Sequence, residues 1–100
     1  MADIVSIIPP KIDLADKNLG KVRLMPMYKV ILHNDDVNSM HHVVRALQDV
    51  FKFEAQKCVS LMLEAHNNGL VLCKVEPLEL AEFHREKLQS CSLTATIEPS

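Results

Sequence analysis

The spacing of the hydrophobic residues changes along this chain between a period of two and a period of 3.6, and this change limits the folds available to it. Alternating or β-rich runs predict strands, whereas apolar residues three or four positions apart predict the buried face of a helix. The first run is YKVILH at residues 28–33. The spacing predicts six elements, in the order strand, helix, helix, strand, helix and strand, over residues 28–33, 40–51, 54–67, 70–75, 77–88 and 93–98.

Residues that begin and end helices support these boundaries. Asn38 or Ser39 can cap the first helix, and Asn68 followed by Gly69 can end the second. Pro77 fits the first turn of the third helix, because an N–H group there needs no partner. Since three short strands need one face covered, we expect an α+β fold, a small βααβαβ sandwich in which three helices cover a three-stranded antiparallel sheet. The alternation does not fix the strand order.

The folded unit is expected over residues 28–98, as one domain. All four aromatic residues lie at or after Tyr28, whereas three of the five prolines lie before it. Residues 1–27 mix short apolar segments with scattered charges and show no sustained period, which predicts a flexible N-terminal extension.

Composition excludes several classes of protein. The net charge is -2 and the pI is about 6.2, which disfavours nucleic acid as a partner because binding phosphates requires a basic face. No apolar run approaches the roughly 18 residues of a membrane span, so no membrane association is expected. Two glycines are too few for a Walker A or dinucleotide-binding loop.

The three cysteines are widely spaced and contain no CxxC pair, so each is expected to be a small buried hydrophobic residue. The first residues, MADIVSIIPP, lack the basic start and long apolar core of a secretory signal. Free thiols and a cytoplasmic location are therefore expected.

The segment from His33 to Asp36 places an amide and two adjacent acids at a strand end before a helix. One interpretation is structural: an Asx turn with a helix cap, in which the helix dipole favours Asp36. The other is cation recognition, in which Asp35 accepts a hydrogen bond from an ammonium group and Asn34 supplies an amide oxygen.

Two predicted helices place apolar residues where they could form a cup beside this segment. Met62, Ala65 and His66 share one helical face, and Met40 and Val43 lie one turn apart on the other helix. Methionine adapts to several side-chain shapes. An apolar cup with an acidic rim suits a ligand with a positive head and an apolar body, although the pattern alone favours ordinary core for Met40, Val43 and Met62.

Enzyme and metal hypotheses have weaker support. His33 and Asp35 would point to the same side of an extended segment, but no nucleophile or phosphate-binding loop accompanies them. Five histidines suggest a metal, yet the sequence contains no HExxH and no paired Cys and His spacing. We expect no catalytic residue, no metal site and no cofactor.

A specific combination of segments is present: YKVILHNDDVNSM at residues 28–40, VV at residues 43–44, LMLEAH at residues 61–66 and Gly69. This combination resembles the ClpS family, adaptors that hand N-end-rule substrates to a Clp AAA+ unfoldase and its protease. The resemblance covers about residues 27–83 well and the last predicted strand loosely.

The resemblance implies three groups of site residues. The α-amino group and first peptide unit of a substrate would be bound at Asn34, Asp35, Asp36, Asn38 and His66. The first side chain would enter a pocket lined by Met40, Val43, Met62, Ala65 and Leu93. The N-terminal domain of the unfoldase, of the ClpA or ClpC type, would dock on Glu79, Glu82 and His84.

The chain departs from the family pattern at three places. Asn38 and Ser39 replace the usual Thr-Pro, Ala65 stands where Val is common, and His84 replaces a common Lys. The second change should widen the pocket, and the third could make docking weaker or more sensitive to pH. These departures suggest an altered side-chain preference.

The resemblance therefore implies a monomeric adaptor for substrates that begin with Phe, Tyr or Leu, whose N-terminal extension assists delivery. The alternative is a regulator of the same fold that docks on the unfoldase and changes its substrate choice without a working pocket. A metal-binding or hydrolytic protein is the third possibility, and bound metal or turnover would reveal it.

Overall fold

The computed structural model describes residues 26–100. The predicted N-terminal extension lies outside the described residues except for Pro26 and Met27, and Met27 is the first residue of a strand. Three strands form one antiparallel sheet with the order β2-β1-β3. Strand β1 (Met27–His33) is central, between β2 (Leu70–Pro77) and β3 (Thr94–Pro99).

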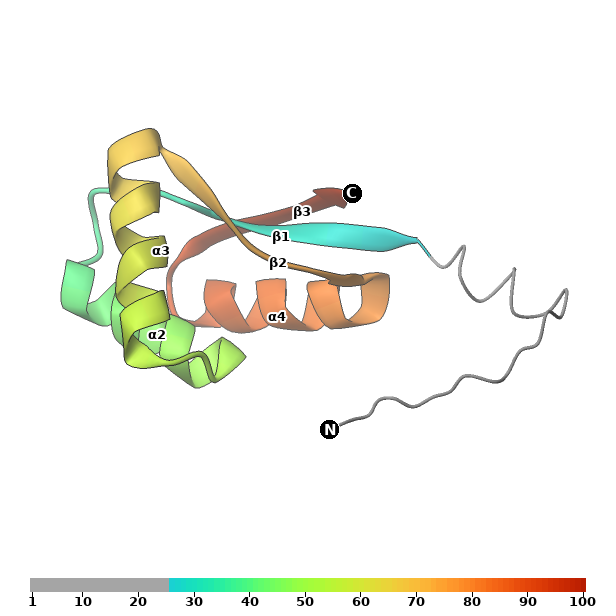
Figure 1. Ribbon diagram of the computed structural model, residues 1–100, viewed down its shortest axis with the longest axis horizontal. Helices are drawn as coiled ribbons and strands as arrows, with labels where there is room; N and C mark the ends of the chain where they lie inside the picture. Colours follow the sequence, from blue (N-terminus) through green and yellow to red (C-terminus); the bar gives the residue numbers. More distant parts are fainter. Residues whose placement is uncertain (1–25) are drawn as a thin grey trace, which may run out of the picture.

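Three helices cover one side of this sheet, as predicted. Helix α4 (Leu78–Ser90) lies along the strands, while α2 (Met40–Phe51) and α3 (Ala55–Asn68) pack together at one end (Figure 1). The core between the layers contains apolar residues from every element, and Val30, Leu47, Cys58 and Leu88 are fully buried. The predicted element order βααβαβ and the α+β class are confirmed.

The ends of the helices follow local chemistry. Ser39 caps α2, because its Oγ accepts a hydrogen bond from the His42 backbone N–H at 3.1 Å; Asn38 forms other bonds. Gly69 ends α3 with a φ of 93°, a conformation that favours glycine. The prediction that Pro77 lies in the first turn of α4 is wrong by one residue, since Pro77 still pairs with Met27 in the sheet.

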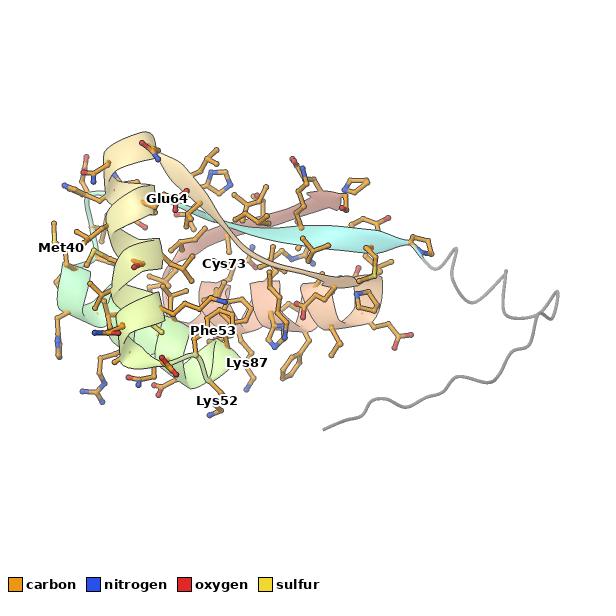
Figure 2. All side chains as sticks on the ribbon, in the orientation of Figure 1. Met40, Lys52, Phe53, Glu64, Cys73 and Lys87 are labelled. Carbon is orange, nitrogen blue, oxygen red and sulfur yellow. The ribbon has the colours of Figure 1, made fainter. Side chains whose placement is uncertain are left out.

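The connection between α2 and α3 is short, and a pair of aromatic rings packs beside it. Lys52 ends α2 with a φ of 63°, and the rings of Phe51 and Phe53 stack with centroids 5.0 Å apart. Figure 2 shows Lys52 and Phe53 at this end of the helix, away from Met40 at its start. The end of α2 therefore packs against the connection to α3, whereas Met40 lies at the opposite end of the helix.

Strand β2 contains an irregularity that reverses which side chains face the helices. Val30 pairs with Lys74, but Ile31 pairs with Leu72, so Cys73 is an extra residue in β2. As a result Val75 is 39% exposed, whereas Glu76 is only 2% exposed. Strict alternation would have placed Val75 inside.

The prediction that each cysteine is buried is confirmed for two of the three and is wrong for Cys91. Cys58 and Cys73 are buried, Cys91 is half-buried, and all three are free. Burial raises the pKa of the Cys73 thiol to about 12, so this group stays protonated at neutral pH.

Candidate functional site

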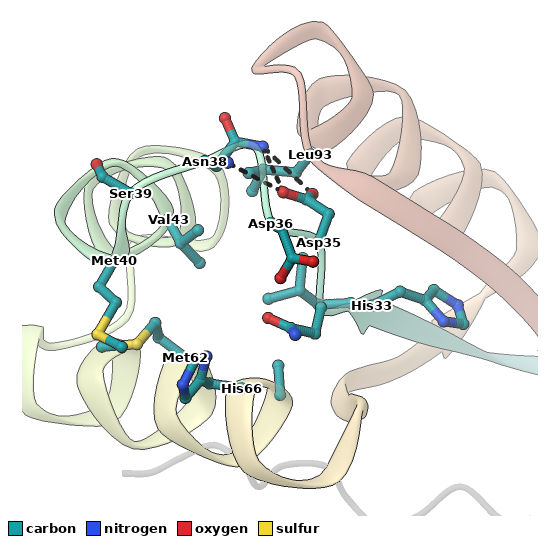
Figure 3. A pocket seen from close by; sticks show the side chains of 13 residues that line it. His33, Asp35, Asp36, Asn38, Ser39, Met40, Val43, Met62, His66 and Leu93 are labelled. Atoms are coloured by element: carbon teal, nitrogen blue, oxygen red, sulfur yellow. Dashed lines mark hydrogen bonds between the residues drawn. The ribbon is translucent and has the colours of Figure 1, made fainter.

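A pocket of about 290 Å³ opens where the loop after β1 meets the start of α2, the face of α3 and the turn before β3 (Figure 3). Its lining comprises Leu32, His33, Asn34, Asp35, Asp36, Asn38, Ser39, Met40, Val43, Met62, Ala65, His66 and Leu93. All ten residues predicted to bind an α-amino group, a first peptide unit or a first side chain are among them. Their role in binding stays a prediction.

The apolar part of the pocket has a buried floor and an exposed mouth. Met62 and Ala65 of α3 and Leu93 before β3 are each at most 8% exposed. Met40 at the start of α2 is 47% exposed, and Figure 3 shows its side chain pointing toward that of Met62. Because Met40 is free to adjust while the floor is packed, the pocket can adapt at its mouth.

The Asp35 carboxylate shapes its own loop. Its Oδ1 accepts hydrogen bonds from the backbone N–H groups of Val37 at 3.0 Å and Asn38 at 3.1 Å. The Asn38 side-chain amide lies 3.2 Å from both carboxylate oxygens, and the Thr94 hydroxyl donates to Oδ2 at 3.4 Å. This is the Asx turn of the structural interpretation, and it also holds the carboxylate at the pocket.

These bonds keep Asp35 ionised. Burial alone would raise the pKa of its carboxyl, but the hydrogen bonds from Asn38, Val37 and Thr94 outweigh this, and the pKa lies below its ordinary value. The pocket therefore carries a negative charge at neutral pH, which favours a cationic ligand group.

Two further polar residues face the same opening. The Asn34 backbone N–H donates to the Gly69 carbonyl at 2.9 Å, which ties the loop after β1 to the end of α3. His66 lies one turn earlier on α3, so this bond brings the side chains of Asn34 and His66 to one pocket. Both residues are exposed and accessible to a ligand.

The structure separates the three predicted docking residues. Glu79 and Glu82 are exposed on α4. His84 instead points inward: its side chain is 12% exposed, and its Nδ1 lies 2.5 Å from Glu76 Oε2. Its ring also packs against Phe51, with centroids 4.7 Å apart. The role of all three in docking stays a prediction, and His84 has a structural role besides.

Leu32 and Ser39 also line the pocket, although neither was predicted to do so from the sequence. Ser39 directly precedes Met40 as a candidate helix cap, and this position was the signal for its place at the pocket. His33 also contributes to the lining, but its Nε2 lies 2.7 Å from the Thr96 hydroxyl. Figure 3 shows its ring turned away from Asp35, so the structure forms no acid–base pair from them.

Within residues 26–100, no three His, Cys, Asp or Glu side chains are grouped as metal ligands would be. No helix in this part of the chain is long and apolar enough to cross a membrane. What the geometry offers is a binding pocket with an ionised rim and an apolar floor.

The fold and this pocket define the class: a small α+β protein with a pocket that has an acidic rim and an apolar floor. Residues 23–96 match the family model described as "ATP-dependent Clp protease adaptor protein ClpS". The chain belongs to the ClpS family of Clp protease adaptors. Its relatives are adaptors, which agrees with the expectation of a protein without catalysis.

Individual relatives give the same result. The chain is 49% identical over 74 residues to the ClpS adapter of Prochlorococcus marinus (strain MIT 9515), covering 73% of this chain and 70% of that one. It is 49% identical over 86 residues to the ClpS adapter of Synechococcus sp. (strain CC9902), covering 84% and 83%. The structure of Agrobacterium tumefaciens ClpS2 bound to L-phenylalaninamide superimposes with a TM-score of 0.72 at 28% identity, covering 76% of this chain and 99% of that one.

Proposed function

We propose that this adaptor binds the free α-amino group and the bulky hydrophobic first side chain of substrate proteins that begin with Phe, Tyr or Leu. It then hands them to the N-terminal domain of a Clp AAA+ unfoldase. The observation that carries the proposal is the pocket itself, in which the ionised Asp35 carboxylate and a floor of Met62, Ala65 and Leu93 meet. Each part recognises one feature of an N-terminal residue.

The Asp35 carboxylate can accept an ammonium group at Oδ2. Oδ1 accepts bonds at 3.0, 3.1 and 3.2 Å, whereas the contacts of Oδ2 are longer, at 3.2 and 3.4 Å. A carboxylate offers about four acceptor positions, and bonds near 3.4 Å are weak. The five contacts already use these positions, so an ammonium group would bind at Oδ2 by displacing the weak bond from Thr94, with Asn34 and His66 as further polar partners.

The size of the pocket suits one side chain. Its volume of about 290 Å³ lies at the lower limit for small-molecule sites. Each hydrogen bond to the charged amine contributes roughly 1.5–3 kcal/mol, and burial of a Leu or Phe side chain adds about as much. After association costs, a Kd on the order of micromolar follows, which permits later release.

The ligand of the Agrobacterium protein supports this proposal. L-phenylalaninamide carries a free α-amino group, an aromatic side chain and an amide in place of the next peptide bond. It therefore presents the same groups as the first residue of a polypeptide that begins with Phe.

Selectivity should follow from both halves of the pocket. Acetylation removes the amine charge, and an internal Phe has no ammonium group. A β-branched first residue carries bulk at Cβ near Met40, so Val and Ile should bind poorly. Ala65 leaves more room than a Val would, and we therefore expect Leu to bind less tightly than Phe.

The test is a series of labelled peptides that differ only in the first residue, titrated by fluorescence anisotropy. We expect binding of free Phe, Tyr and Leu peptides, and loss of binding when the Phe peptide is acetylated. Equal affinity for the free and the acetylated Phe peptide would refute the proposal.

A second function keeps one observation in its favour. Asp35 uses Oδ1 fully in its own turn, as it would in a regulator that docks on the unfoldase without a working pocket. Binding to the isolated N-terminal domain of the unfoldase, measured beside the peptide series, separates the two. Docking without peptide binding identifies the regulator, and loss of docking in a Glu79→Ala, Glu82→Ala variant assigns the surface.

A further inference from the structure

The turn before β3 is joined to the start of α2 by side-chain hydrogen bonds. The Cys91 carbonyl lies 2.7 Å from His42 Nε2, and the next carbonyl, of Ser92, accepts a bond from the Asn38 amide at 2.7 Å. These bonds cross between segments about 50 residues apart in the sequence. Two consecutive carbonyls of the turn are thus directed toward α2.

The turn has a conformation that needs support. Ser92 has a φ of 69°, in the left-handed region that residues with a Cβ adopt at a cost. The Leu93 backbone N–H still reaches back to the Leu88 carbonyl at 3.1 Å, and the Leu93 side chain is 5% exposed in the pocket floor. The placement of this part of the floor therefore depends on how the turn is held.

Of the two side chains that bond the turn, His42 is the one that does not also bond Asp35. Asn38 also bonds both oxygens of Asp35, so a change at Asn38 would disturb the amine rim as well. His42 is outside the pocket lining, and its ring bonds the turn while its backbone N–H bonds the Ser39 cap. A substitution of its ring therefore isolates the turn.

We propose that His42 is a positioning residue for side-chain selectivity: its ring holds the Cys91 carbonyl and so fixes Leu93 against the incoming first side chain. The inference rests on the proposed function. Imidazole must present its Nε2–H to the carbonyl, so the ring acts as a donor here. Loss of this donor should loosen the apolar floor and leave the amine rim at Asp35 unchanged.

The experiment compares His42→Phe, which keeps a ring and removes the donor, with His42→Gln, whose Nε2 lies the same number of bonds from Cβ. The same substitution at the neighbouring exposed residue, His41→Phe, is the matched control. Affinities are measured by competition for two peptides that differ only in a first Phe or a first Ala. The Ala peptide reports the amine rim with little contribution from the floor.

For His42→Phe we expect about three- to fivefold weaker binding of the Phe peptide, the loss of roughly one exposed hydrogen bond. The affinity for the Ala peptide should stay within about twofold of the wild-type value, since the hydrogen bonds at the amine rim are not changed. His42→Gln should restore the affinity for the Phe peptide, and His41→Phe should change the affinity for neither peptide.

The proposal is wrong if the preference for Phe over Ala is unchanged in His42→Phe, or if His42→Gln fails to restore it. Amide hydrogen exchange at Leu93 in the free protein supplies a readout that needs no peptide, and it should accelerate in His42→Phe. If the wild type binds no Phe peptide, the proposed function fails. The exchange rate at Leu93 then tests by itself whether the His42 ring holds the turn. Unchanged exchange would then overturn this role of His42.

Discussion

Two partly or fully buried acids, Asp35 and Glu76, lie at opposite ends of β1, and their surroundings differ. Asp35 is half-buried and receives hydrogen bonds from two backbone N–H groups, an amide and a hydroxyl. Glu76 is 2% exposed, and within residues 26–100 its side chain accepts one hydrogen bond, from His84 Nδ1 to Oε2 at 2.5 Å. Its Oε1 finds no hydrogen-bond partner in the part of the chain that the structure describes, although Lys74 Nζ lies 3.7 Å away.

This difference separates a site from a structural contact. Because several donors on its own loop hold Asp35, the carboxylate keeps its place and its charge while one edge faces a cavity. Glu76 faces the inside of the fold, and losing its one partner would leave a buried carboxylate without a hydrogen bond. Substitutions at Asp35 should therefore act mainly on binding, and those at Glu76 mainly on stability.

The largest effect is expected for His84→Phe, which keeps the packing on Phe51 but removes the bond to Glu76. The free energy of unfolding should fall by about 2–3 kcal/mol, because a buried carboxylate loses its partner. Urea denaturation measures this change, and affinity for a Phe peptide should stay within about twofold.

The double variant Glu76→Leu, His84→Leu is the control, since replacing both partners by apolar groups can be close to neutral. If the double variant is as unstable as the single one, the loss reflects packing and the contrast with Asp35 fails.

A smaller effect, on binding, is expected for Asp35→Ala. Affinity for a Phe peptide should fall about 10- to 100-fold, equivalent to roughly 1.4–2.8 kcal/mol, because the amine loses its charged partner. Glu64→Ala removes an exposed acid of equal charge on α3, outside the pocket lining, and should change affinity little. Equal losses of affinity in the two variants would indicate a general electrostatic effect and would contradict a specific role of Asp35 as the partner of the amine.

The smallest effect concerns pH. The pKa of Asp35 is lowered in the folded state, so in the acidic range the unfolded chain binds more protons than the folded one. The stability that this group adds is present above its unfolded pKa of about 3.9 and is lost as pH falls through the folded value.

Chemical denaturation of the wild type and Asp35→Asn, at pH 6 and at successive values down to pH 3, tests this sign. The stability difference between the two proteins should narrow as the pH falls. A difference that stays constant over this range would contradict the lowered pKa.

Much of the fold could be predicted because it depends on local patterns. The apolar spacing of the two α2 and α3 stripes identified both helices, and Gly69 marked the end of one of them. Boundaries moved by only one or two residues, as at Pro77, because the sheet retained a residue that local preference assigned to the helix. The strand order was not predictable from alternation, since pairing depends on contacts between distant segments.

The pocket depends both on local sequence patterns and on contacts between distant segments. The turn chemistry of Asn34 and Asp35 and the helical spacing of Met62, Ala65 and His66 were visible in the sequence, and the structure places these residues around one cavity. That Asn38 bonds the Ser92 carbonyl and that His42 bonds the Cys91 carbonyl could not be read from spacing. Those partners meet only when β3 pairs with β1.

By itself, the sequence determined which segments become helices and strands and where a polar loop meets apolar faces, because periodicity and turn chemistry act over a few neighbours. Only the tertiary structure decided that Glu76 lies inside and Val75 outside. The extra residue at Cys73 reverses the alternation of β2, and this depends on pairing with β1. His84 then turns inward to meet Glu76, because a buried carboxylate requires a hydrogen-bond partner.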